Sequence, residues 1–217
     1  MFWLELLVIL LVLSAALLSL FFKNFNRDPE RMIPSGSVVV SPADGRVLDI
    51  VELDEGQLVD MPKGLLGRIR SMTDDLGEGP HYLIPIFMNP FDVHVQRAPI
   101  TGRVLDIRRK PGGFIKAYSL DALENATVEM LLDTVLGKVK VLQTAGLLVR
   151  HIHNNLSSGT EVRMGDRFGN IDFGSQVTLI IPKSEAIEVA VKKGDYVYGG
   201  ETVMAVYKLE DSAGLSS

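Results

Sequence analysis

The hydrophobic pattern opens with a long, nearly unbroken apolar run over residues 1–22, MFWLELLVILLVLSAALLSLFF. Its polar exceptions are Glu5, Ser14 and Ser19. From Leu6 to Phe22 the run holds 17 residues, which is the short end of what an α-helix needs to cross a bilayer core of about 30 Å. The pattern predicts a membrane-anchoring helix over 1–22.

The charges that flank this run indicate how it is oriented. No basic residue precedes it, whereas Lys23, Arg27 and Arg31 follow. Basic residues favour the cytoplasmic side of a membrane helix, so we expect the rest of the chain there. A cleaved signal peptide is the alternative, but it normally begins with a basic segment. The pattern favours an uncleaved anchor in the cell membrane.

Beyond the anchor the pattern changes to short strands. Residues 23–36 are polar, carry Pro29 and Pro34, and are predicted to be a linker. From residue 37 to 210, stretches rich in Val and Ile alternate with Gly or Pro turns, which is typical of β-structure. They are SVVVS, RVLDIVEL, HYLIPIFM, GRVLDIRR, KVKVLQT, VTLIIP, IEVAVKK and ETVMAVYKL.

Three segments are less regular. Residues 54–80 contain many Gly and Pro residues and are predicted to be a long loop. Residues 120–137 have a composition that a helix would tolerate, but a hairpin arm fits their neighbours better. The tail at 211–217 is expected to be disordered.

An internal repeat bears on the fold. PADGRVLDI at 42–50 recurs as PITGRVLDI at 99–107, with seven of nine positions identical. Coincidence between two turn-then-strand units explains part of this match, and a duplicated β-unit explains all of it. VKKGDYVYGGE at 191–201 resembles the hairpins of biotinyl and lipoyl carrier domains. We therefore predict an all-β fold, a flattened barrel resembling a duplicated biotinyl/lipoyl-like hybrid.

Composition narrows the chemistry. The chain has no cysteine, which excludes disulfides, thiolate zinc sites, iron–sulfur clusters and a Cys nucleophile. A net charge of −5 gives no reason to expect a nucleic-acid partner. His151 and His153 alternate along a strand end, but no carboxylate or third histidine stands nearby in the sequence. An exposed loop is the better interpretation of this pair, and we predict no metal site.

Three other residues could carry chemistry. His94 lies between two prolines, and alternation places it on one strand face with Asp92 and Gln96. A solvated strand edge explains that pattern equally well. Asp44 sits in an Asp-Gly turn, and Ser175 follows Gly174 next to a buried-strand pattern. The residue types supply an Asp, a His and a Ser that could assemble, without showing that they do.

Five stretches, taken in order, resemble the phosphatidylserine decarboxylase family in its short prokaryotic form. They are NRDPER at 26–31, VSPADGR at 40–46, IFMNPFDVHVQRAP at 86–99, RFG at 167–169 and FGS at 173–175. Each is weak alone, but the ordered set spans nearly the whole region after the anchor.

The resemblance implies a self-cleaving proenzyme. The Ser175 hydroxyl attacks the Gly174 carbonyl, elimination releases the chain that ends at Gly174, and Ser175 becomes a covalent pyruvoyl group. His94 is then the base and Asp44 its orienting carboxylate. The products are chains 1–174 and 175–217, which form a heterodimer. Whether this heterodimer assembles further into a homo-oligomer stays open.

The resemblance also implies a reaction and a substrate. The pyruvoyl carbonyl forms a Schiff base with the substrate amine and takes up electrons as carbon dioxide leaves. The substrate is a membrane phospholipid, phosphatidylserine or the ether-linked archaetidylserine, and the product is the ethanolamine lipid. An anchor suits a substrate that stays in the bilayer. Leu65, Leu66, Arg68 and Arg70 could touch lipid or form a plain surface loop.

The chain departs from the family pattern at two positions. Longer relatives carry a second histidine three residues after the first, where this chain has Arg97, so His94 has to serve both self-cleavage and decarboxylation or be assisted. Gln176 follows Ser175 where Ser, Thr or Arg is usual.

A non-enzymatic, membrane-anchored carrier or adaptor on the same barrel is the main alternative. The hairpin turn at 198–200 lacks the lysine that a biotin or lipoate carrier needs. A phosphohistidine-transfer domain using His94 is a second alternative. Either would leave the Gly174–Ser175 bond uncut. A soluble pyruvoyl amino-acid decarboxylase is disfavoured by the anchor.

Overall fold

The computed structural model describes residues 2–54, 58–62, 68–72, 75–110, 126–146, 151–172 and 175–208. Gly174, the tail at 211–217, and Leu65 and Leu66 of the predicted loop lie outside these residues.

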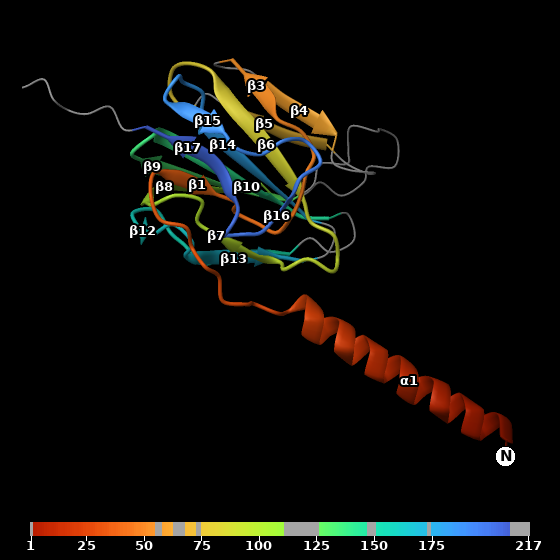
Figure 1. The fold of residues 1–217 in the computed structure, drawn as a ribbon. Coiled ribbons are helices and arrows are strands. Elements are labelled where there is room, and N and C mark those ends of the chain that lie inside the picture. Colours follow the sequence, from red (N-terminus) through yellow and green to blue (C-terminus); the bar gives the residue numbers. More distant parts are fainter. Residues whose placement is uncertain are drawn as a thin grey trace, which may run out of the picture.

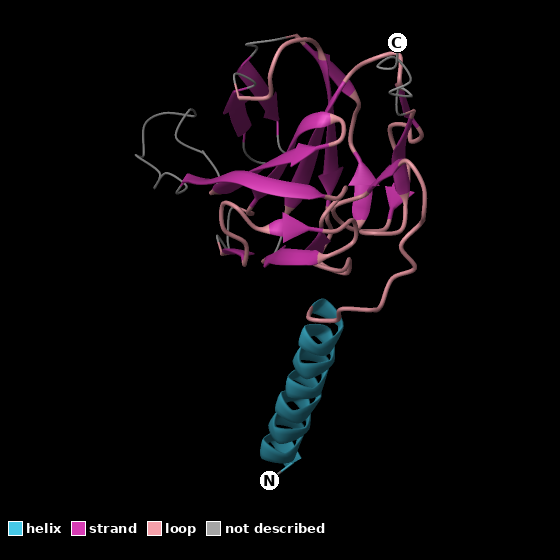
Figure 2. Ribbon diagram, turned by 90° about the vertical axis from the view of Figure 1, so that its left-hand side faces the viewer, coloured by secondary structure: helices cyan, strands magenta, loops and turns pink. Residues whose placement is uncertain are grey.

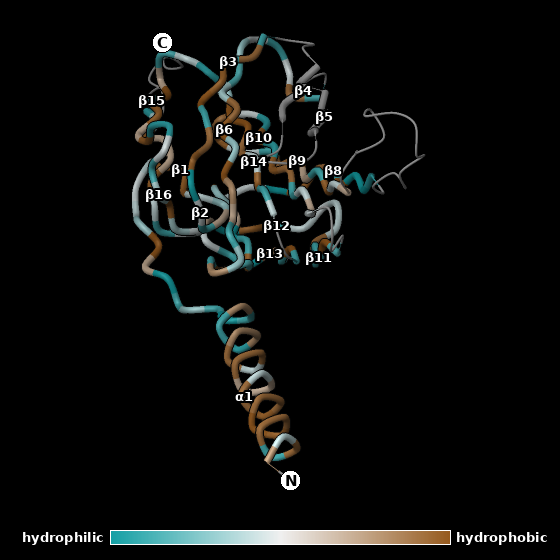
Figure 3. Tube along the Cα trace, turned by 90° about the vertical axis from the view of Figure 1, so that its right-hand side faces the viewer, coloured by the Kyte–Doolittle hydropathy of each residue, from teal (hydrophilic) through white to brown (hydrophobic). Residues whose placement is uncertain are grey.

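The apolar run forms helix α1, Phe2–Phe25, which extends away from the β-domain (Figures 1 and 2). Its 24 residues span about 36 Å at 1.5 Å per residue, enough to cross the hydrocarbon core of a bilayer. Phe25 is its one buried residue, and hydrophobic positions predominate along the helix (Figure 3). The predicted helix is confirmed, and it is compatible with membrane association.

The domain is built on one curled antiparallel sheet, in which β3 pairs with β6 beside the main strand order (Figure 1). Listed in sheet order, its strands are β12 (Glu161–Val162), β8 (Gly102–Lys110), β9 (Thr127–Thr134), β10 (Gly137–Thr144), β14 (Gln176–Pro182), β6 (His81–Phe87), β2 (Gly45–Val47) and β16 (Tyr196–Val197), with β3 at Val51–Leu53. The predicted all-β class is confirmed. Within the segment 120–137, residues 120–125 lie outside the described residues, and the rest contains β9, one arm of a hairpin with β10, as expected.

Three smaller antiparallel sheets complete the fold. Their strands, in sheet order, are β1 (Val38–Val40), β17 (Val203–Tyr207) and β15 (Ile187–Val189); β11 (Ile152–Asn154), β13 (Arg167–Ile171) and β7 (Val95–Arg97); and β4 (Leu58–Pro62) with β5 (Arg68–Met72). The β4–β5 pair corrects the prediction of a long loop at 54–80. Pro62 is the last residue of β4, so Gly and Pro residues in the sequence of a segment do not show that strands are absent from it.

Strands β6 and β14 are buried on both faces. Ile84 and Leu179 point into the larger hydrophobic cluster, while their neighbours Leu83 and Ile180 point into the smaller one behind the sheet. Successive side chains of a strand alternate between faces, so continuous Val, Ile and Leu runs need apolar packing on both. β14 therefore forms the centre of the domain, and Ser175 immediately precedes it.

The sequence repeat corresponds to a structural repeat. The Val40 N–H donates to the Pro99 carbonyl at 2.8 Å, and the Arg97 N–H donates to the Pro42 carbonyl at 2.9 Å. Because residues 40 and 42 correspond to 97 and 99, the two bonds are the same contact made once in each direction. The predicted duplicated β-unit is confirmed by this exchange.

The duplication extends to the second half of each unit. β2 exchanges hydrogen bonds with the hairpin at Gly194 and Asp195, as β8 does with Gly159 and Thr160. The sheet β1–β17–β15 corresponds in the same way to β7–β13–β11. The domain thus consists of two similar units that share the large curled sheet.

The repeat places a glycine at the first residue of β2 and at the first residue of β8. A Cβ on Gly45 would lie 2.3 Å from the Phe87 carbonyl oxygen, and one on Gly102 would lie 2.4 Å from that of Asp133. Any side chain would collide with a backbone that cannot move aside. At both positions, only glycine allows the neighbouring strand to pack this closely.

Candidate active site

The loop that leads into β7 is built on an Asn-Pro-Phe-Asp turn. The Asp92 N–H donates to the Asn89 carbonyl at 3.0 Å, and the Phe91 N–H donates to the Asn89 side-chain oxygen at 2.8 Å. The Asp92 carboxylate accepts from the Asn89 backbone and side chain at 2.8 and 2.6 Å, and from the Tyr196 hydroxyl at 2.6 Å. These bonds fix the backbone two residues before His94.

His94 is 2% exposed, so the alternative of a solvated strand edge is wrong. Its Nδ1 lies 2.9 Å from the Asp92 carbonyl oxygen. A carbonyl only accepts, so Nδ1 carries the proton and Nε2 keeps its lone pair. Nε2 is buried and has no hydrogen-bond partner among the described residues. The Phe25 ring, at the end of α1, packs on the imidazole with ring centroids 4.2 Å apart.

Burial lowers the pKa of His94 below its ordinary value. The hydrogen bond to the Asp92 carbonyl and the charges of Asp92 and Asp172 oppose this effect, while the charge of Arg27 adds to it. The net direction is downward, which keeps the imidazole neutral at neutral pH. His94 is therefore prepared to accept a proton at Nε2.

A chain of buried amides holds the backbone of His94 in place. Gln96 donates to the His94 carbonyl at 2.7 Å, Gln143 donates to Gln96 at 3.0 Å, and Asn154 donates to Gln143 at 3.0 Å. The chain joins β7, β10 and β11. Gln96 was expected on the face of His94, whereas Gln143 and Asn154 gave no signal beyond polar residues at the ends of strand patterns.

Ser175 is fully buried immediately before β14. Its hydroxyl donates to the Asp172 carbonyl, and its own carbonyl accepts from the Met88 N–H at 3.0 Å. The Ile171 N–H donates to the His94 carbonyl at 3.3 Å. Ile171, the last residue of β13 and four residues before Ser175, therefore lies beside the residue that precedes β7, His94.

Asp44 is also buried, at 3% exposure. One of its carboxylate oxygens accepts from the Gly199 N–H at 2.7 Å, and Arg31 binds both oxygens at 3.0 and 2.8 Å. Burial raises the pKa of Asp44, against the opposing effects of Gly199 and Arg31. Among the described residues, Asp44 and His94 share no hydrogen bond. The acceptor that orients the imidazole is the Asp92 carbonyl.

The segment predicted as a linker is held against the domain. We call its residues 26–31 the strap. Arg97, 5% exposed, donates to Asp28, to the Pro29 carbonyl and to the Gly165 carbonyl at 3.0, 3.0 and 3.1 Å. Arg31 anchors the other end of the strap. A guanidinium stays protonated in proteins, so Arg97 cannot replace a second histidine as a base.

The remaining histidines lie apart from this arrangement. His151 and His153 are exposed, with ring centroids 6.5 Å apart, and His151 lies 3.6 Å from a carboxylate oxygen of Asp172. His81 is buried at the start of β6. Within the described part of the chain, no three His, Asp or Glu side chains are grouped so that they could hold a metal ion.

Comparisons with a family model and with known proteins point to the same family. The family model described as phosphatidylserine decarboxylase matches residues 18–205. A phosphatidylserine decarboxylase proenzyme of Chlorobaculum tepidum is 35% identical over 90% of this chain and 82% of its own length. A protein of Methanothermobacter thermautotrophicus, provisionally named an archaetidylserine decarboxylase proenzyme, is 40% identical over 85% of this chain and 80% of its own. This chain belongs to the phosphatidylserine decarboxylase family and is a carboxy-lyase.

Proposed function

We propose that the chain is made as a proenzyme, cuts itself between Gly174 and Ser175, and then decarboxylates a membrane-bound serine phospholipid. The observation that carries the proposal is the buried His94, whose Nε2 has no described partner, beside Ile171, which stands four residues before the buried Ser175. The relatives are named proenzymes, which supports a maturation step.

Self-cleavage uses only the chain and water. The Ser175 oxygen attacks the Gly174 carbonyl carbon, its proton passes to His94 Nε2, and breaking the C–N bond leaves an ester. Removal of the Ser175 Cα proton then eliminates the chain that ends in the Gly174 carboxylate. The dehydroalanine left at residue 175 tautomerises and is hydrolysed, which releases ammonia and leaves the pyruvoyl group.

His94 accepts the first proton in this scheme. Its imidazolium form is stabilised by the carboxylates of Asp92 and Asp172, the two charges that raise its pKa. In the uncut chain, the Ser175 hydroxyl donates to the Asp172 carbonyl and has to turn from it to reach Nε2. The burial of both groups excludes water that would compete as nucleophile.

Asp44 is proposed as the third, carboxylate member of the self-cleavage group. The support comes from the repeat, in which Thr101 occupies the position of Asp44. Thr101 accepts the Met164 N–H at 3.0 Å, just as Asp44 accepts that of Gly199. An uncharged hydroxyl therefore suffices as the acceptor that this turn requires. The buried charge at Asp44 is not explained by the turn alone, which is why we assign it a role in self-cleavage.

The residues around Ser175 suit a pyruvoyl group. Two buried polar atoms, His94 Nε2 and Gln176 Oε1, have no hydrogen-bond partner among the described residues and could face the reacting substrate. When formed, the pyruvoyl carbonyl supplies the electron sink for decarboxylation. The His94 Nε2–H then donates a proton to the carbon that has lost carbon dioxide. Arg97 cannot act as a base, so His94 is the residue that we propose for both steps.

The two product chains are expected to stay together as a heterodimer. Chain 175–217 contains β14, which lies between β10 and β6 of chain 1–174 in the middle of the large sheet. Removing it would expose the core residues Val177, Leu179 and Ile181. The mature enzyme is proposed to lie on the cytoplasmic side of the cell membrane, held there by α1.

The intact mass of the full-length protein tests this proposal, with Ser175→Ala as control. We expect two fragments, one ending at Gly174 and one beginning with a pyruvoyl-blocked residue 175, and a single uncut control chain. Incubating the mature protein with diacyl phosphatidylserine and with archaetidylserine then identifies the lipid by release of carbon dioxide. A folded chain that stays uncut would refute the proposal in favour of a non-enzymatic carrier or adaptor.

A further inference from the structure

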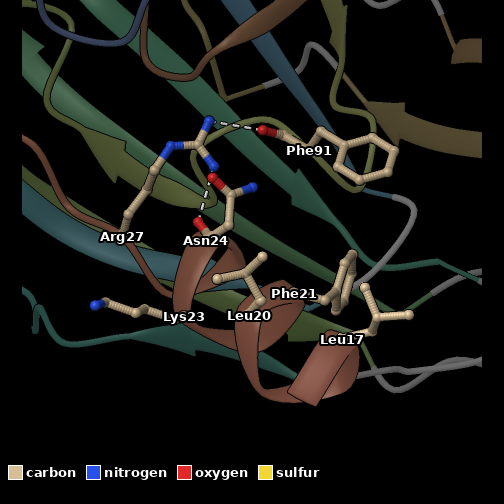
Figure 4. Close-up of a pocket in the computed structure, with 7 residues that line it drawn as sticks. All are labelled: Leu17, Leu20, Phe21, Lys23, Asn24, Arg27 and Phe91. Atoms are coloured by element: carbon tan, nitrogen blue, oxygen red, sulfur yellow. Dashed lines mark hydrogen bonds between the residues drawn. The ribbon is translucent and has the colours of Figure 1, made fainter. Parts of the chain in front are cut away.

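A groove lies where the anchor helix meets the domain. It encloses about 630 Å³ between the last turns of α1 and the turn that carries Phe91 (Figure 4). Leu17, Leu20 and Phe21 line it from the helix, and Phe91 lines it from the domain. The Phe21 and Phe91 rings meet edge to face, with centroids 6.0 Å apart.

The apolar part of the groove is unusually exposed. Leu17 is 69% exposed, and Leu20 and Phe91 are each 66% exposed. These side chains continue the apolar surface of a helix that is long enough to cross a membrane. The apolar material that would cover them is therefore the hydrocarbon of the bilayer.

The end of the groove nearest the domain is cationic. The Arg27 guanidinium donates to the Asn24 carbonyl at 2.8 Å and to the Phe91 carbonyl at 2.6 Å (Figure 4). These bonds hold it in position, and a guanidinium has five N–H donors, so further donors remain for an anion. Lys23 is exposed and has no ion-pair partner among the described residues. A phosphate group suits this cationic end.

The same helix end touches the candidate catalytic base. Phe25 packs on the His94 ring at 4.2 Å between centroids, and the charge of Arg27 lowers the pKa of His94. A phosphate bound at Arg27 would therefore lie close to His94. In a serine phospholipid, the amine and carboxylate are only a few bonds from the phosphate, so the reacting headgroup could extend from Arg27 toward the base.

We propose that this groove binds one phospholipid of the adjoining leaflet, which we call the anchor-groove lipid. Its phosphate is held by Arg27 and Lys23, and one acyl chain lies along Leu17, Leu20 and Phe91. The helix thus contributes part of the lipid site in addition to holding the domain at the membrane. That the bound lipid is the substrate rests on the proposed function, whereas the groove itself does not.

Binding is tested on the uncut Ser175→Ala protein in phosphatidylserine vesicles that contain a phosphatidylserine with a diazirine on one acyl chain. After irradiation, we expect mass spectrometry to place the adducts on residues 17–21 and on the peptide containing Phe91. Leu20→Trp fills the groove and should reduce the Phe91 adduct at least several-fold. Leu18→Trp is the matched control, because Leu18 is 57% exposed on the same helix but does not line the groove.

A kinetic split tests whether the lipid is the substrate. In the mature enzyme, Leu20→Trp should raise KM for long-chain phosphatidylserine several-fold more than KM for a water-soluble, short-chain phosphatidylserine, and Leu18→Trp should alter neither value. If Phe91 is labelled equally in Leu20→Trp and Leu18→Trp, the proposal that the groove binds a lipid is wrong, even if the enzyme is active. Groove labelling in the Ser175→Ala protein, combined with a chain carrying the native Ser175 that folds but neither cuts itself nor decarboxylates, would support the groove and refute only the proposed function.

Discussion

The two copies of the repeat carry the same turn with different chemistry. We call residues 41–45 the Asp44 turn and residues 98–102 the Thr101 turn. In each, a side-chain oxygen accepts the N–H of an equivalent hairpin residue, Gly199 for Asp44 and Met164 for Thr101. The Asp44 turn is buried and its carboxylate is paired with Arg31, whereas Thr101 is exposed and uncharged.

The difference between Asp44 and Thr101 shows which part of the turn the fold requires and which part it does not. The turn needs an acceptor, which either residue supplies, and a buried carboxylate is a costly way to provide one. Arg97 shows the same contrast, because the equivalent residue in the other copy is the apolar Val40. Departures from the internal symmetry thus mark the candidate site and the strap that packs beside it.

The buried and the exposed arginine contacts of the strap should differ most in what they contribute to stability. Arg31 and Asp44 form a pair whose side chains are 8% and 5% exposed, so Arg31→Gln leaves a buried carboxylate without its counter-charge. We expect a loss of about 3–5 kcal/mol in the free energy of unfolding. Arg167→Gln is the matched variant, since Arg167 is 42% exposed and Glu30, one of its partners, is 89% exposed. Its cost should be about 1 kcal/mol or less.

Urea unfolding of both variants in the Ser175→Ala background measures this contrast without interference from cleavage. Similar losses at Arg31 and Arg167 would mean that burial of the Asp44 turn does not govern how the strap is held.

Exchanging the residues of the two turns tests the charge itself. Asp44→Thr keeps an acceptor for Gly199 and removes the carboxylate, so we expect self-cleavage to slow on the order of 10²-fold. Thr101→Asp adds an exposed charge and should leave the cleavage rate unchanged. Gel analysis of newly made protein, scored on the folded fraction, gives both rates. If Asp44→Thr matures at the normal rate, the Asp44 charge serves the strap and has no part in cleavage.

The sequence predicted the elements that depend on local pattern. The apolar run predicted α1, strand periodicity predicted the β-domain, and the repeat at 42–50 and 99–107 predicted the duplication. The strands β4 and β5 were missed, because the many Gly and Pro residues of 54–80 indicated a loop.

The contacts of the candidate site were harder to predict than its residues. His94 was singled out by its neighbours in sequence, but its burial beneath Phe25 depends on how the anchor helix meets the domain. The partner of Asp44 is Arg31, which the sequence placed in a predicted linker. Such pairings depend on tertiary packing between distant segments, and no local periodicity encodes them.

The smallest expected effect concerns the pH dependence of cleavage. The reaction requires the neutral form of His94, and burial lowers the pKa of this residue below the ordinary value of 6.5. As pH falls, the base therefore stays unprotonated until the pH drops below that value. Self-cleavage should keep its rate from about pH 8 down to about 6.5 and decline only in more acidic solution.

Arg27 offers a way to move this acid limb. Its charge is one of the causes that lower the His94 pKa, so Arg27→Gln should raise that pKa and shift the decline in cleavage rate toward higher pH. Arg46→Gln is a suitable control, because the Arg46 side chain is exposed and bonds to the Gly194 carbonyl in the Asp44 copy of the repeat. An acid limb that stays fixed in Arg27→Gln would show that the Arg27 charge does not set this limb, and would count against His94 as the group that accepts the Ser175 proton.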